Sequence, residues 1–120
     1  MKYNNRTLFS GVTMNTNLAS TAEAIPDIYG YCIQAVFTGT PTGTFKLQAS
    51  NDAFKQVTPS TPQVPVNWTD IANSSVDVTA AGDYTWNVIG AFYPFVRLVY
   101  TDTSGGTSTA VLTATINIKG

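Results

Sequence analysis

Apolar side chains recur at every second position along much of this chain, which is the period of a β-strand with one buried face. Segments with this pattern, or short apolar segments between turn residues, occur at 6–13, 29–37, 44–50, 68–71, 75–78, 83–88, 95–101 and 111–119. Clusters of Gly, Pro, Asn, Asp and Ser separate them, as in a β-sandwich. The residues expected to share one face of their own strand are Phe45, Leu47, Ala49, Val76, Val78, Tyr84, Trp86, Val88, Val96, Leu98, Tyr100, Leu112, Ala114, Ile116 and Ile118.

Segment 29–37 is apolar almost throughout. This pattern predicts a strand that is buried on both faces or that is central to its sheet. A turn with Pro41 and two glycines follows at 38–43. Segments 29–37 and 44–50 are therefore expected to pair as an antiparallel hairpin.

Two parts of the chain lack a regular strand pattern. Residues 1–28 are expected to form one edge strand followed by a long polar connection. Residues 51–67 contain Pro59, Pro62 and Pro65, and proline is excluded from the interior of a sheet. Because a loop of this length in a compact domain is often functional, 51–67 is the candidate partner-contacting loop.

Together these elements predict an all-β fold. We expect one domain over 1–120, an antiparallel β-sandwich of about eight strands with the Greek-key connections of a jelly roll. A parallel sheet would need helical crossovers, and helix-forming residues are scarce, with Glu23 the single glutamate. Threonine, which is β-branched and favours sheets, occurs 19 times.

The low charge of the chain limits the classes of partner that it is expected to bind. Charged residues make up 11% of the chain and the formal net charge is −1, with no basic cluster, which disfavours nucleic-acid binding. Weak self-repulsion at this charge tolerates close packing against copies of the chain or against another protein. The sequence shows no signal-peptide pattern and no apolar run near the ~18 residues of a membrane span, so we expect a soluble protein made in a cytoplasm, without membrane contact.

Candidate chemistry is limited because the sequence contains no histidine. A Ser-His-Asp triad, a Cys-His pair and most zinc or iron sites need that residue. The aspartates fall at expected turns and strand ends, where they bond to nearby backbone amides, so a catalytic carboxylate pair is disfavoured. We expect no enzyme activity, no cofactor and no metal, with a calcium site at 50–52 as an open alternative. Cys32 is expected to be a small buried hydrophobe.

Aromatic residues divide into two groups. Those expected to fill the core are Phe45, Trp68, Tyr84, Trp86, Phe95 and Tyr100. Phe54, Phe92 and Tyr93 fall in loops, where they cap the sandwich, anchor a protein interface or contact a ligand such as a sugar ring. Arg97 faces away from Val96 in its strand, and it either pairs with an aspartate across the sheet or contacts a partner. Phe54, Phe92, Tyr93 and Arg97 are thus the candidate interface residues.

Several strings of residues carry a resemblance. They are CIQAVFTGTPTGTFKLQASND at 32–52, WTDI at 68–71, AAG at 80–82 and FVRLVY at 95–100. With these strings the chain resembles small structural proteins of tailed bacteriophages, such as capsid decoration, head-fibre and tail-accessory subunits. The resemblance implies a jelly-roll-like β-sandwich on the virion that associates with copies of itself and with the major capsid protein or another virion protein. It carries over no functional residue.

The same strings also resemble, more loosely, discoidin-type carbohydrate-binding jelly rolls, although the chain lacks the cysteine pair of many such domains. Two functions therefore stay open. The first is a non-enzymatic virion structural subunit, a homo-oligomer with a trimer as the favoured order, made in the host cytoplasm and located in the virion. The second is a carbohydrate-binding module of a tail or head fibre that binds surface glycans.

Overall fold

The computed structural model describes residues 3–25, 30–51, 65–91 and 93–119. The strands in this part of the chain are β1 (Tyr3–Thr13), β2 (Leu18–Ala19), β3 (Glu23–Ala24), β4 (Gly30–Phe37), β5 (Gly43–Ser50), β6 (Thr69–Asp70), β7 (Val76–Val78), β8 (Gly82–Ile89), β9 (Phe95–Asp102) and β10 (Val111–Lys119). Over the same residues there is no helix, and hence none that could cross a membrane.

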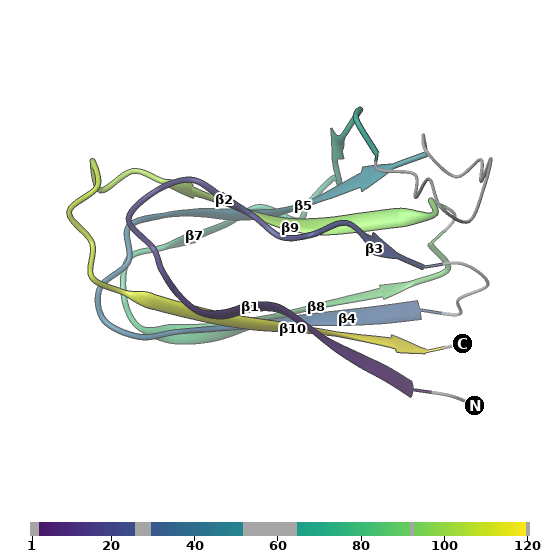
Figure 1. Ribbon diagram of the computed structural model, residues 1–120, viewed down its shortest axis with the longest axis horizontal. Helices are drawn as coiled ribbons and strands as arrows, with labels where there is room; N and C mark the ends of the chain where they lie inside the picture. The colour runs from purple at the N-terminus through teal and green to yellow at the C-terminus, as the bar shows by residue number, and fades with distance from the viewer. Residues whose placement is uncertain (1–2, 26–29, 52–64, 92, 120) are drawn as a thin grey trace, which may run out of the picture.

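The strands form two antiparallel sheets that face each other (Figure 1). Sheet A has the order β1-β10-β4-β8, and sheet B has the order β2-β9-β5-β6, with β3 also paired to β9 and β7 to β5. β2 and β3 both pair with β9, and β6 and β7 both pair with β5. Each of these two pairs of short strands lies along a single edge of sheet B, so the ten strands fill eight places in the two sheets. The long strands β4, β5, β8, β9 and β10 alternate between the sheets along the chain. This is the jelly-roll arrangement, and it confirms the predicted fold class.

The expected hairpin between segments 29–37 and 44–50 is wrong. β4 pairs with β10 and β8 in sheet A, whereas β5 pairs with β9 in sheet B. The connection between them spans the sandwich and is hydrogen-bonded on both sides, from Thr38 N to Val111 O at 3.0 Å and from Thr103 N to Thr42 O at 2.9 Å. A short turn sequence fits a hairpin and a crossing equally well, and strands distant in the sequence decide between them.

The alternation in the last two predicted strands identifies their buried faces correctly. The buried inward residues of β9 and β10 are Val96, Leu98, Tyr100, Leu112, Ala114, Ile116 and Ile118. At the centre of the core, the ring centroid of Phe45 lies 4.9 Å from that of Tyr100, 5.6 Å from that of Phe37 and 5.9 Å from that of Trp86. Aromatic rings from both sheets therefore meet in the middle of the sandwich.

The apolar segment predicted at 29–37 contains β4, one of the two inner strands of sheet A, as one of its two interpretations predicts. Burial on both faces is wrong: Ile33 is fully buried, but Gln34 and Val36 are exposed, because only one face of sheet A packs against sheet B. Cys32 is not in the core as expected, since it lies on the outer face and is partly exposed. Its remaining burial raises the pKa of its thiol.

Three aromatic residues expected in the core lie elsewhere, namely Trp68, Tyr84 and Phe95. Tyr84 is 41% exposed because β8 is an edge strand, although its ring packs against Trp86 at 4.8 Å between centroids. Phe95 is on the outer face of sheet B, since the inward positions of β9 begin with Val96. Trp68 comes before the two-residue strand β6, too short for alternation to specify a face, and it lies on that outer face as well.

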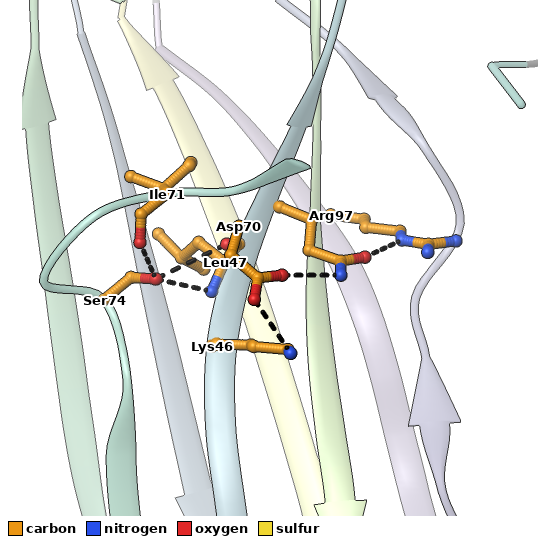
Figure 2. Close-up of polar contacts among 7 residues, drawn as sticks. Lys46, Leu47, Asp70, Ile71, Ser74 and Arg97 are labelled. Atoms are coloured by element: carbon orange, nitrogen blue, oxygen red, sulfur yellow. Dashed lines mark hydrogen bonds and ion pairs between the residues drawn. The ribbon is translucent and has the colours of Figure 1, made fainter. Parts of the chain in front are cut away.

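Serine side chains fill the two breaks in the outer strands of sheet B. Between β2 and β3, Ser20 N donates to Leu98 O and Ser20 Oγ accepts from Leu98 N, both at 2.9 Å. Between β6 and β7, Ser74 Oγ accepts from Leu47 N at 3.0 Å and donates to Ile71 O at 2.7 Å (Figure 2). Each hydroxyl satisfies a buried backbone group that a continuous strand would otherwise satisfy.

Candidate functional site

A chain of polar side chains crosses the outer face of sheet B (Figure 2). Strand register places Gln48 opposite both Arg97 on β9 and Asp70 on β6. Asp70 accepts hydrogen bonds from Gln48 Nε2 at 2.9 Å and from Lys46 Nζ at 3.0 Å, and Arg97 Nε donates to Gln48 Oε1 at 2.8 Å. The Gln48 amide, and after it the Lys46 ammonium, lowers the pKa of the Asp70 carboxyl. Arg97 therefore contacts Asp70 indirectly, through Gln48, and does not form the direct pair with an aspartate that was one of its two expected roles.

Arg97 also forms one side of a groove. Its guanidinium carbon lies 4.3 Å from the ring centroid of Trp68, which is the geometry of a cation–π contact. The groove has a volume of about 410 Å³. Its lining residues are Ser20, Thr21, Ala22, Pro65, Trp68, Phe95 and Arg97. Partial burial lowers the pKa of Arg97, which still remains charged at neutral pH.

The groove combines apolar surface with one convergent cation. Trp68, Phe95 and Pro65 supply flat apolar contact, and Arg97 supplies N–H donors. The Nε of this guanidinium donates to Gln48 Oε1. Since ligand sites are concave, mostly apolar and contain a few placed polar groups, this groove is suited to a ring with acceptor or acidic substituents.

Two of the four predicted interface residues, Tyr93 and Arg97, lie in the described part of the chain, and they line different grooves. Phe54 and Phe92 lie outside the described residues. Tyr93 is half-buried, and its hydroxyl is 2.6 Å from that of Tyr31; burial raises the pKa of both phenols. Tyr93 lines a second groove, of about 480 Å³, with residues of β5 and β6, whereas Arg97 lines the first. Their role as partner contacts stays a prediction.

The calcium site that the sequence left open at 50–52 lies only partly within the described residues. Asp52 lies outside the described residues, and Ser50 is buried. In the segments that the structure describes, no three His, Cys, Asp or Glu side chains gather into a possible metal site. Asp102 does what was expected of the aspartates, since its carboxylate accepts from Ser104 N at 3.0 Å and Gly106 N at 3.1 Å and so fixes a turn.

Sequence reasoning missed three residues of the sheet B surface, namely Gln48, Trp68 and Asp70. The signal for Gln48 was present, because it alternates with buried Leu47 and must face outward. Its partners Asp70 and Arg97 depend on register across three strands. Local alternation does not determine that register.

The outer face of sheet A is different, because two neighbouring rows across its four strands carry no charge. Register aligns Asn5, Asn117, Cys32 and Asn87 in one row, and Thr7, Thr115, Gln34 and Thr85 in the next. A side-chain hydrogen bond of 2.7 Å joins Asn5 Nδ2 to Asn117 Oδ1. Apart from the Cys32 thiol, these two rows consist of hydroxyl and amide side chains.

Comparison with known proteins establishes the fold alone. No protein-family model matches the chain, and no curated protein sequence matches it. Among solved structures, the protein YomS derived from the SPBc2 prophage is similar, with a TM-score of 0.57 and 10% identity over 98% of this chain and 92% of that one. The coat protein of Tobacco streak virus is similar with a TM-score of 0.51 and 16% identity over 99% and 85% of the two chains. The jelly roll of this chain is therefore one that a prophage protein and a viral coat protein also have.

Proposed function

We propose that this chain is a non-enzymatic structural subunit of a bacteriophage particle, a capsid decoration or stabilising protein that self-associates and binds coat protein. The observation that carries the proposal is the fold. It matches a prophage-derived protein and a viral coat protein over nearly the whole of this chain. The resemblance of segments 32–52, 68–71, 80–82 and 95–100 to small phage structural proteins supports the same function.

Two uncharged rows on the outer face of sheet A support this proposal physically. Burying a charged side chain in an interface costs several kcal/mol unless it is paired. The rows that contain Asn117 and Thr115 include no charged residue, so they can be covered by protein without that cost. Amides and hydroxyls can also bond across the new contact.

Purification of the encoding phage or induced prophage tests this function. We expect the chain to co-purify with particles through a density gradient, in a fixed ratio to the major capsid protein. Purified chain added to particles that lack it should sediment with them. A chain that is absent from particles, does not rebind them and is monomeric at every concentration would contradict the proposal.

A second candidate, a carbohydrate-binding module, is favoured by the groove beside Trp68 and Arg97. Aromatic rings stack on the apolar faces of sugars, and a guanidinium binds a carboxylate with two parallel hydrogen bonds. The groove supplies both kinds of contact, so surface glycans that contain acidic sugars are the proposed ligands.

A glycan array with the wild-type chain tests this second function, followed by titration of any glycan that binds. Trp68→Ala is expected to weaken binding by about tenfold, close to 1.4 kcal/mol. The matched control is Tyr84→Ala, an exposed aromatic residue of the other sheet. Tyr93→Ala tests the alternative that the loop aromatic residue contacts the sugar. An array with no bound glycan would remove this candidate.

A further inference from the structure

The four sheet edges of the sandwich differ in how readily another strand can pair with them. An edge strand exposes unpaired backbone N–H and C=O groups, which can template pairing with another chain. Proteins usually prevent this with short edge strands, bulges, prolines or lysines. The edges here are β1 and β8 in sheet A, and the β2/β3 and β6/β7 positions in sheet B.

Three of these edges have such protection. β1 shows register shifts between Thr7 and Phe9 and between Phe9 and Val12, and Gly11 in the second shift has a φ of 61°. These irregularities are bulges, which bend an edge strand and interrupt its ladder. At both edges of sheet B the strands are only two or three residues long.

β8 has none of these features. It is eight residues long and pairs with β4 at every position from Gly82 to Ile89 without a register shift. The strand contains no proline and no basic residue, and Asp83 is its single charge. Ile89 is 75% exposed. Among the described strands, β4 is the one that pairs with β8, so no described strand occupies the other edge of β8.

Space beside this edge is already formed. A groove of about 250 Å³ lies between residues 84–88 of β8 and the turn at 71–74. The turn is fixed by the hydrogen bond from Trp86 Nε1 to Ser74 O at 2.9 Å. A strand added beside β8 therefore meets a groove that is bordered by this turn.

β8 is complementary to itself. In a two-fold antiparallel pair centred on Trp86, Tyr84 of one copy lies opposite Val88 of the other, and Thr85 lies opposite Asn87. These two pairings match apolar with apolar residues and polar with polar ones. Asp83 lies opposite Ile89, so the single charge of the strand does not meet its own copy. A two-fold contact of one surface with itself is the commonest form of homo-oligomer.

We propose that the open edge of β8 pairs with β8 of a second copy of this chain, which joins two four-stranded sheets A into one continuous eight-stranded sheet. The inference rests on the self-association in the proposed function and goes further by naming the surface and its symmetry. The building block is then a two-fold dimer, in place of the trimer favoured from sequence.

A charge-swap experiment tests the β8 contact. The double variant Thr85→Lys/Asn87→Lys places lysines of the two copies opposite each other, on exposed outward positions that leave the core unchanged. Like charges directly opposite destabilise a strand pair, so the dimer dissociation constant should rise at least about tenfold in sedimentation equilibrium. Mixing this variant with Thr85→Glu/Asn87→Glu should restore the dimer. The matched control, Asn5→Lys/Thr7→Lys, makes the same change on β1 and should dimerise like the wild type.

The outcomes separate this inference from the proposed function. Circular dichroism of every variant checks that the fold is retained, and slower amide hydrogen exchange in β8 on association is the supporting result at residue level. A wild type that dimerises, with a lysine variant that dimerises equally well, overturns the β8 contact and leaves the virion function standing. A monomeric wild type that still binds particles also overturns it. If the β8 lysine variant then loses particle binding while Asn5→Lys/Thr7→Lys keeps it, the edge pairs with a strand of another protein.

Discussion

The two sheets enclose one core but satisfy their backbone groups differently. In sheet A, four long strands pair with one another, and the outer face is flat and uncharged in its two central rows. In sheet B, both outer positions are broken, and the hydroxyls of Ser20 and Ser74 take over hydrogen bonds from the missing backbone. Each break also lines a groove, at 20–22 in one case and 71–74 in the other. The interrupted strands of sheet B thus border grooves, whereas the continuous strands of sheet A form a flat outer face and leave the edge of β8 open among the described strands.

The largest expected effect comes from matched truncations in the shared core. Ile33→Ala in β4 and Leu98→Ala in β9 each remove a fully buried aliphatic side chain. Each should lower the free energy of unfolding by about 2–5 kcal/mol, because both side chains fill the same core. Urea unfolding measures the change. Ile33→Val, expected to cost about 0.5–1.5 kcal/mol, is the control, and a truncation in one sheet without effect would show that the core is not shared.

Ser74→Ala tests the dependence of sheet B on hydroxyls. It leaves the buried N–H of Leu47 without its partner, which should cost about 1–3 kcal/mol of unfolding free energy. The adjacent exposed Ser75, changed to Ala, is the control and should stay within about 0.5 kcal/mol of the wild type. Equal stability of the two variants in urea unfolding would contradict this view of the break.

Substitutions of Gln48 and Gln34, one glutamine on the outer face of each sheet, compare how much the polar side chains of the two faces contribute to stability. Gln48→Ala in β5 removes the hydrogen bonds to Asp70 and from Arg97. Exposed polar contacts contribute little, so the expected loss is about 0.5–1 kcal/mol. Gln34→Ala in β4, an exposed glutamine of sheet A, should change the free energy by less than about 0.5 kcal/mol. Thermal unfolding of both variants at low salt distinguishes them, and a larger loss for Gln34→Ala would reverse the comparison.

Acid should weaken the structure chiefly through sheet B. Hydrogen bonds from Ser104 lower the pKa of Asp102, and Gln48 lowers that of Asp70. A carboxyl with a lowered folded-state pKa stabilises the fold above its unfolded pKa of about 3.9, and this contribution is lost as pH falls through the folded value. The Tm should therefore fall below about pH 4.

Asp102→Asn tests the source of this acid sensitivity. It removes the titrating group at the end of β9 and should make the Tm less dependent on pH in that window. Scanning calorimetry of the variant and the wild type over the same pH series measures the difference. Identical acid dependence of the two proteins would assign the loss to other carboxyls.

Sequence alone predicts the strands well and their pairing poorly. The period of two identified the inner face of β10, from Leu112 to Ile118, because one buried face is a local property of a strand. It failed for β4 and β5, since the choice between a hairpin and a crossing depends on distant partners. The same period also gave the wrong face for Trp68, because the neighbouring strand β6 has only two residues and cannot show an alternation. The polar chain through Gln48 could not be predicted, because it exists only in the register of three strands.

The pairing of β1 with β10 has a consequence for how the chain reaches this structure. Tyr3 lies opposite Lys119 and Thr13 opposite Val111, so the first strand must wait for the last one to be synthesised before it can pair. β4, between β10 and β8, likewise lacks one neighbour until then. Folds dominated by such distant contacts fold in milliseconds to seconds, much more slowly than helical bundles. Until β10 is available, β4 can pair only with β8, and both edges of that two-stranded pair stay open.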